Sequence, residues 1–111
     1  MNTNRHEVKI TDREKTYGGG YRGVRVITTL RKLRDEFGSE SFPKSDDGKV
    51  THEWAFEIKP DSILTIYDWK EGKLIGLDDE IEWHIGGKHV TEAEIVEFLC
   101  ANCFTGDYQI D

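Results

Sequence analysis

The chain of 111 residues lacks most of the features that identify whole classes of protein. No apolar run approaches the ~20 residues that a membrane-spanning helix requires, and no apolar segment follows the N-terminus as it would in a signal peptide. Only two prolines occur and aromatic residues are ample, which is typical of a globular and not of a disordered sequence. We therefore expect a single domain over residues 1–111, in the cytoplasm and without a membrane partner.

An excess of positive charge is also missing. The formal net charge is −7, and it is uneven: residues 1–50 hold 11 Lys and Arg against 8 Asp and Glu, whereas residues 51–111 hold 4 against 14. Binding to duplex nucleic acid depends on neutralising phosphates over a continuous basic face, so that class of partner is not expected. A small anionic ligand needs only a local group of donors, and the acidic half could dock against a basic partner protein.

Cysteine is scarce, and no complete catalytic signature occurs. Cys100 and Cys103 are spaced C-x-x-C at the end of a predicted helix, where the helix dipole opposes thiolate formation. A zinc site would need a second pair of ligands at suitable spacing, and the chain has none. We expect reduced, structural cysteines, with no metal and no cofactor.

Apolar periodicity predicts an α+β domain, in which a mostly antiparallel sheet of four to five strands has two helices packed on one face. Leu30, Leu33 and Phe37 have helical spacing before Gly38, and a Thr-x-x-Glu capping box at Thr91 starts a second helix. The strands are expected near residues 7–10, 21–27, 53–59, 63–69 and 81–85.

The sharpest hint of a ligand is Gly86-Gly87-Lys88, between the last predicted strand and the second helix. A glycine turn at a helix N-terminus offers backbone N–H groups to an anion, with a lysine beside them. A Walker A loop is not present, because Glu82 and His89 stand where it needs Gly and Ser or Thr. The alternative is that the glycines only permit a tight turn.

Aromatic residues fall on neighbouring predicted strands, where they could contact a base. We expect Trp69 and Trp83 to stack on it and Lys70 and His84 to pair with its polar edges, whereas Trp54 belongs to the core. Aromatic residues on strands are more often part of a core, so that alternative stays open.

The glycines between Tyr17 and Tyr21 predict a flexible loop through which a backbone could approach a ligand closely. Tyr21 and Arg22 would then close over the ligand, from a neighbouring subunit if the protein is a homo-oligomer. A plain connection between two elements would have the same composition.

An enzymatic alternative rests on Pro60-Asp61 and Asp68-Trp69-Lys70, which resemble the acidic motif of metal-dependent nucleases. The two acids would have to share one metal ion, yet an extended strand between them would hold them ~23 Å apart. We therefore expect a protein that is not an enzyme.

Two stretches of the chain, DSILTIYDWKE at residues 61–71 and EWHIGGK at 82–88, resemble a group of small uncharacterised proteins of tailed phages and prophages. The resemblance covers under a fifth of the chain. It implies a phage origin and action inside a bacterial host cell. Small phage proteins of this kind counter host defence by occupying a defence protein or by sequestering a nucleotide signal.

These observations favour a non-catalytic phage accessory protein that sequesters a small nucleotide-derived anionic signal. The first alternative is an inhibitor that binds a host defence or nucleic-acid-binding protein through its acidic half, and the second is the nuclease. The predicted ligand-binding residues are Tyr21, Arg22, Trp69, Lys70, Trp83, His84, Gly86, Gly87 and Lys88.

Overall fold

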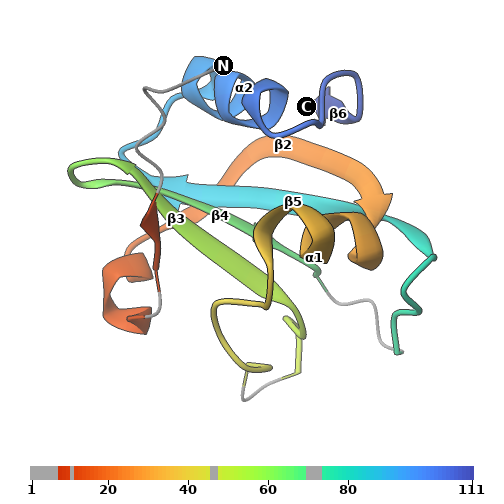
Figure 1. Cartoon of the computed structure of the whole chain (residues 1–111). Coiled ribbons are helices and arrows are strands. Elements are labelled where there is room, and N and C mark those ends of the chain that lie inside the picture. Colours follow the sequence, from red (N-terminus) through yellow and green to blue (C-terminus); the bar gives the residue numbers. More distant parts are fainter. Residues whose placement is uncertain (1–7, 11, 46–47, 70–73) are drawn as a thin grey trace.

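Six strands form one antiparallel sheet in the order β1-β3-β4-β5-β2-β6 (Figure 1). The structure is a computed structural model of the chain, and it describes residues 8–10, 12–45, 48–69 and 74–111. The elements are β1 (Val8–Lys9), a 3-10 helix η1 (Arg13–Thr16), β2 (Gly20–Thr29), α1 (Leu30–Phe37), β3 (Glu53–Lys59), β4 (Ser62–Tyr67), β5 (Glu80–Lys88), α2 (Glu92–Ala101) and β6 (Tyr108–Ile110).

Both helices begin and end at the residues that the sequence marks. The Thr29 side chain accepts a hydrogen bond from the Lys32 backbone N–H at the start of α1, and Gly38 ends that helix with a φ of +78°. At α2, both hydrogen bonds of the capping box between Thr91 and Glu94 are present. Local sequence therefore fixes where each helix meets the sheet.

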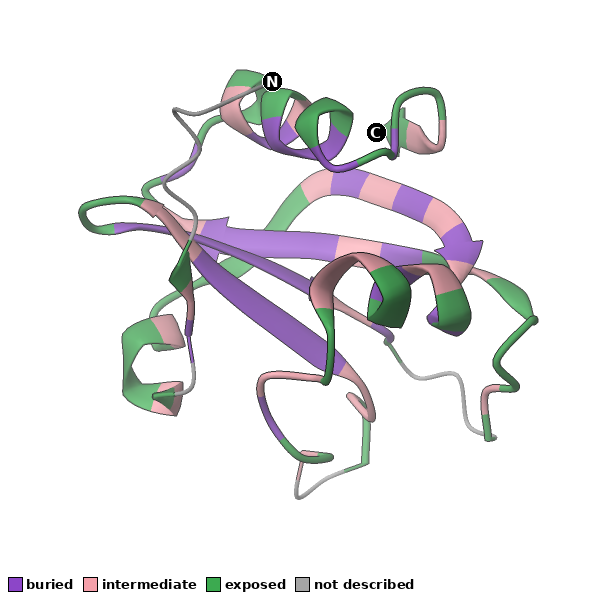
Figure 2. Cartoon of the chain, in the orientation of Figure 1, coloured by how far each residue is buried: buried purple, intermediate pink, exposed green. Residues whose placement is uncertain are grey.

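One face of the sheet and both helices enclose the main hydrophobic core. β4 is central and apolar on both of its faces, and Figure 2 shows β4 buried over most of its length, β3 in its first half and β5 towards its end. Large side chains from the strands meet the apolar sides of α1 and α2. The core includes Val24, Val26, Leu30, Leu33, Trp54, Leu64, Ile66, Trp83, Ile85, Ile95, Phe98, Leu99 and Phe104.

The opposite face of the sheet carries no helix of this core. A small apolar cluster of Ile10, Phe42, Ala55 and Ile63 covers part of it. Elsewhere on that face the 3-10 helix η1 and the glycine loop that follows it lie beside β4 and β5 and leave a hollow between them. We call this side of the sheet the open face.

The structure corrects three details of the predicted fold. The sheet has six strands instead of four to five, because the three-residue β6 pairs with β2 and is too short to show a periodicity. β5 continues to Lys88, so Gly86 and Gly87 lie within a strand and not in a turn. Cys100 and Cys103, expected to be reduced and structural, are free thiols but are both exposed, so they do not belong to the core. No helix within the described ranges is long and apolar enough to span a membrane.

Candidate functional site

A cavity of about 670 Å³ opens on the open face, where β4 and β5 run beneath the loop after η1. We call it the open-face pocket. Its floor comes from β4 and β5, its sides from η1, the glycine loop and the ends of β3 and β4. It is lined by Arg13, Thr16, Tyr17, Gly18, Gly19, Gly20, Tyr21, Val50, Glu53, Thr65, Tyr67, Trp69, His84, Gly86 and Gly87.

Two glycines allow the loop and the strands to pack closely beside the pocket. A Cβ atom on Gly86 would lie 2.9 Å from Thr65 Oγ1, 3.0 Å from the Gly20 carbonyl oxygen and 3.0 Å from Tyr67 Cε1. A Cβ on Gly19 would lie 3.2 Å from the carbonyl oxygen of Gly87. The loop and the sheet therefore approach each other closely at these two positions, which any side chain there would disturb.

Four aromatic rings form a continuous wall around the pocket. The His84 ring lies 5.0 Å from the Tyr21 ring and 5.7 Å from the Tyr67 ring, measured between centroids, and Tyr67 contacts Trp69 edge-on at 6.3 Å. Trp69 and Tyr21 keep 40% and 43% of their surface exposed. Exposed ring faces beside a cavity are suited to stacking against a flat ligand.

A bulge in β2 aims Tyr21 at this wall. Tyr21 pairs with Gly86, but the next paired residue is Val24, opposite Ile85, so extra residues including Gly23 (φ +77°) bulge out. The two extra residues leave the alternation of faces unchanged but place Tyr21 opposite Gly86 instead of Lys88, close to the His84 ring; β-bulges are common beside binding sites.

The Tyr21 hydroxyl is held at the rim by a polar network. It donates a hydrogen bond to Asp111, whose carboxylate also accepts one from Arg25 Nε at 2.9 Å. Arg25 in turn pairs with Glu82 at 2.5 Å. Burial and the hydrogen bond to Asp111 raise the pKa of Tyr21 to about 12, so its hydroxyl stays a proton donor at neutral pH.

The charged pair of the pocket is Arg13 and Glu53, whose Nη1 and Oε1 atoms lie 2.7 Å apart. Glu53 is 8% exposed, and burial raises the pKa of its carboxyl although Arg13 opposes the shift. The Arg13 guanidinium also lies 4.1 Å from the centre of the Phe42 ring. The Glu53 carboxylate is thus held in place by Arg13, whose guanidinium also packs against the Phe42 ring.

A second hollow, of about 660 Å³, adjoins the pocket at the N-terminal end of α2 and shares Tyr17 and Gly18 with it. We call it the basic hollow. Its cations are held by backbone oxygens: Arg22 Nε donates to the Gly87 carbonyl and Lys88 Nζ to that of Tyr17, both at 2.9 Å. Neither cation forms a salt bridge with a carboxylate in the described parts of the chain. The other lining residues are His89, Val90 and Thr91.

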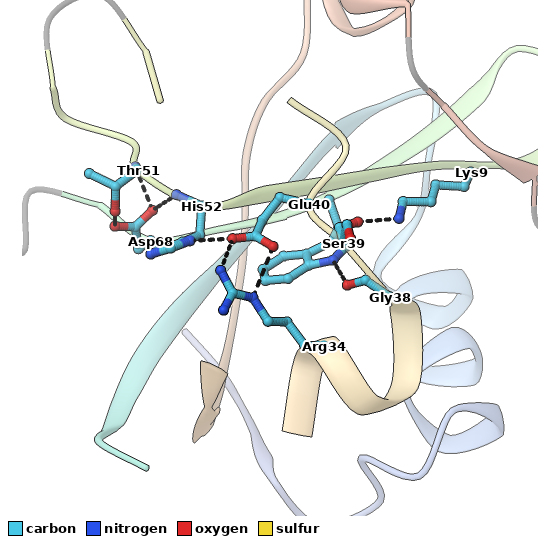
Figure 3. Close-up of polar contacts among 9 residues, drawn as sticks. Lys9, Arg34, Gly38, Ser39, Glu40, Thr51, His52 and Asp68 are labelled. Carbon is cyan, nitrogen blue, oxygen red and sulfur yellow. Dashed lines mark hydrogen bonds and ion pairs between the residues drawn. The ribbon is translucent and has the colours of Figure 1, made fainter. Parts of the chain in front are cut away.

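Hydrogen bonds to the Asp68 carboxylate hold the end of β4 that leads to Trp69 (Figure 3). Asp68 is fully buried, and its carboxylate accepts hydrogen bonds from the backbone N–H groups of Thr51 and His52, each at 2.8 Å, and from the Thr51 hydroxyl. Asp68 therefore joins the end of β4 to the segment that leads into β3. Asp61 lies at the other end of β4, as the strand assignment required, so the two acids of the nuclease motif are not brought together.

A second carboxylate of Figure 3 ties the same segment to α1. Glu40 accepts hydrogen bonds from Arg34 Nε at 3.1 Å and Nη2 at 2.7 Å, and it contacts His52 Nδ1 at 2.5 Å. Burial raises the pKa of Glu40, but the hydrogen bonds from Arg34 and His52 outweigh it and lower the pKa to about 2. This carboxylate remains ionised at any physiological pH.

Five of the nine predicted ligand-binding residues line the open-face pocket: Tyr21, Trp69, His84, Gly86 and Gly87. Arg22 and Lys88 line the basic hollow. Tyr21 reaches the pocket of its own chain, without help from a neighbouring subunit. Lys70 lies outside the described residues.

Trp83 and the Gly-Gly-Lys turn require correction. Trp83 is fully buried on the helix side of the sheet, where its Nε1–H donates to the Thr28 carbonyl oxygen at 3.1 Å. Strand alternation explains this, because Trp83 and its neighbour His84 face opposite sides. Gly86 and Gly87 pair with Tyr21 and Gly20 inside the sheet and form no anion-binding turn.

Among the pocket residues that the predicted set omits, three have a charged or aromatic side chain that the site uses: Arg13, Glu53 and Tyr67. Alternation carried a signal for two of them. Since Trp54 faces the core, Glu53 must face the other side, and Tyr67 lies opposite Glu53 in the ladder between β3 and β4. Arg13 reaches the site through η1, whose position no periodic pattern indicates.

Comparison of the chain with protein-family models, with curated proteins and with solved structures found no match in any of the three. In the described ranges no three His, Cys, Asp or Glu side chains are grouped so as to hold a metal ion. The chemistry of the site therefore has to be read from its own residues, namely aromatic faces, one carboxylate paired with an arginine, and an adjoining pair of cations.

Proposed function

We propose that the protein binds a small nucleotide-derived anion in the open-face pocket and sequesters it without altering it. The observation that carries this proposal is the wall of rings around a cavity of about 670 Å³, a size that suits a drug-sized or nucleotide-sized ligand. The base would lie against Trp69 and Tyr67.

The phosphate group would lie in the basic hollow, beside Arg22 and Lys88. These cations differ from most others in the described chain, because carboxylates already neutralise Arg13, Arg25, Arg31, Lys32, Arg34 and Lys59. Glu92 and Glu94 in the first turn of α2 weaken the pull of that helix N-terminus on an anion. Recognition of phosphate would thus depend on the two side chains.

The biological role that fits such binding is removal of a signalling nucleotide inside a bacterial host by a phage-encoded protein. The resemblance of residues 61–71 and 82–88 to small phage proteins supports this role. So does the absence of a complete catalytic motif in the sequence. Release of the intact ligand from denatured complex would distinguish sequestration from turnover.

The test is a thermal-shift screen of the purified protein against mono-, di- and cyclic nucleotides and ADP-ribose derivatives. A ligand at ~100 times its dissociation constant should stabilise the fold by ~2.7 kcal/mol, which raises the melting temperature by several degrees. The shift should fall to about half or less in Trp69→Ala and be reduced in Lys88→Ala, whereas Lys44→Ala, at an exposed lysine that lines none of these cavities, should keep it. A flat response to the whole panel would refute the proposal.

The acidic half receives less support as a docking surface. Asp78 pairs with Arg31 at 2.7 Å, and the Asp79 carboxylate accepts a hydrogen bond from the Gly76 N–H. Part of the negative charge is therefore neutralised within the chain. Charge reversal at Asp78, Asp79 and Glu80 should leave the thermal shift with nucleotide intact, and loss of a host partner in pull-downs with that variant would instead favour the inhibitor.

A further inference from the structure

Among the residues that the structure describes, Glu53 is the one carboxylate that lines the open-face pocket. It is the first residue of β3 and pairs with Tyr67 across the ladder between β3 and β4, so the two residues are neighbours in the pocket wall. Its side chain keeps only 10% of its surface exposed. A carboxylate in such a place loses most of its hydration and needs hydrogen-bond donors in return.

The protein supplies only part of those donors. Glu53 Oε1 accepts a hydrogen bond from Arg13 Nη1, whereas Oε2 accepts none from any residue in the described ranges. In those ranges no side-chain oxygen that is shut off from solvent lacks a hydrogen-bond partner. Oε2 therefore keeps some contact with solvent, and the open-face pocket is the cavity that Glu53 lines.

The surroundings of Oε2 restrict what could donate to it. The ring of Tyr67, which pairs with Glu53 and contacts Trp69, favours a flat molecule that stacks. An ionised carboxylate can only accept hydrogen bonds, so the edge of that flat molecule must present an N–H group. An exocyclic amino group of a base meets both requirements with two N–H donors, whereas a ring N–H supplies one.

We propose that the open-face pocket selects a base that bears an exocyclic amino group, which donates a hydrogen bond to Glu53 Oε2 while Arg13 holds Oε1. This inference rests on the proposed binding of a nucleotide and specifies its base. Arg13 is a positioning residue, because it orients the carboxylate and is itself held against Phe42.

The experiment compares pairs of nucleotides that differ only in the amino group, by isothermal titration calorimetry. The pairs are AMP with purine riboside 5′-monophosphate, GMP with IMP, and CMP with the 5′-monophosphate of the pyrimidin-2-one riboside. For at least one pair, the wild-type protein should bind the amino member roughly tenfold tighter or more, as expected for a hydrogen bond to a charged acceptor.

Glu53→Gln should abolish or reverse this preference. The Gln oxygen would take the hydrogen bond from Arg13, so the amide NH₂ would face the pocket and oppose an amino group on the ligand. Glu57→Gln is the matched control, because Glu57 is on the same strand and face but lines a different hollow. It should leave the preference unchanged.

Each outcome decides between the two claims. Equal binding of both members of every pair by the wild-type protein would overturn the role of Glu53 and leave nucleotide binding intact. Absence of binding to every nucleotide would overturn both. If Glu53→Gln fails to fold, the comparison in the wild-type protein still decides whether the pocket prefers a base with an exocyclic amino group.

Discussion

The two faces of the sheet are formed by the same alternating strands, yet they differ in how far their tryptophans are buried and in what covers them. On the helix side Trp54 and Trp83 are fully buried, and their indole N–H groups donate to the carbonyl oxygens of Gly38 and Thr28. On the open face Trp69 is 40% exposed at the rim of a cavity. The comparison shows that aromatic residues serve the fold where helices cover the sheet, and are available to a ligand where the cover is incomplete.

The means of holding each face also differ. The helix face is held by apolar packing between strands and helices. The end of the sheet that leads to Trp69 is held by carboxylates: Asp68 joins β4 to the segment before β3, and Glu40 joins that segment to α1 (Figure 3). Substitutions can therefore separate stability from binding, and the expected losses of stability decrease from the fully buried core to the exposed rim of the pocket.

The largest loss of stability should follow Trp83→Ala. Removing a fully buried indole from a packed core costs about 3–5 kcal/mol, which is a large part of the stability of a domain this size. Urea unfolding followed by circular dichroism measures it. A loss below about 1 kcal/mol would mean that Trp83 is not packed in the core.

Asp68→Ala should have the next largest effect, at the end of β4. The substitution leaves the partly buried N–H groups of Thr51 and His52 without their acceptor, at a cost of about 2–4 kcal/mol. Asp35→Ala, at an exposed position of α1, is the control and should change the free energy of unfolding by less than about 0.5 kcal/mol. Equal stability of the two variants would contradict the role assigned to Asp68.

Glu40 should make the stability depend on acidity. Its pKa is about 2 in the folded protein, below the usual 4.5, so its contribution is complete above about pH 4.5 and disappears as the pH falls towards 2. Glu40→Gln should lose about 1–2 kcal/mol at pH 7 and show a smaller decline between pH 5 and 2. Denaturant unfolding at each pH tests this, with Glu36→Gln on α1 as control. Parallel declines in wild type and Glu40→Gln would refute it.

The smallest effect on stability belongs to Trp69→Ala. A half-exposed ring at a rim contributes little to folding, and we expect a change below about 1 kcal/mol. Nucleotide binding should nevertheless fall roughly tenfold or more, because stacking on an aromatic ring contributes about 1–3 kcal/mol per base. Calorimetric titration of the wild-type protein and Trp69→Ala with the nucleotide measures this loss. An unchanged affinity would mean that Trp69 is not part of the site.

The fold could be predicted from the sequence wherever local chemistry determines it. The capping box at Thr91, the glycine stop at Gly38 and the period-two pattern of residues 53–59 each specify an element without help from distant residues. The short β6 could not be predicted, because three residues show no period and the strand exists only through pairing with β2.

The site could be predicted only in part, for a related reason. Glycine and aromatic residues near chain positions 17–22 and 84–88 indicated a ligand, and the structure brings them together. The exact position of each one depends on register: the bulge at Gly23 places Tyr21 opposite Gly86, and alternation turns Trp83 away from the pocket. Arg13 joins Glu53 across 40 residues of sequence, a contact that only the folded chain defines.

The three tryptophans allow one direct test of the claim that the open face is the binding face. We would record ¹H–¹⁵N spectra of the protein while adding the nucleotide that gives the largest thermal shift, and follow the three indole N–H signals. We predict that the Trp69 signal moves while those of Trp54 and Trp83 stay in place, together with shifts at the backbone amides of Gly19, Gly86 and Gly87. Movement of the Trp54 or Trp83 signals with a stationary Trp69 would place the ligand on the other side of the sheet and contradict the claim.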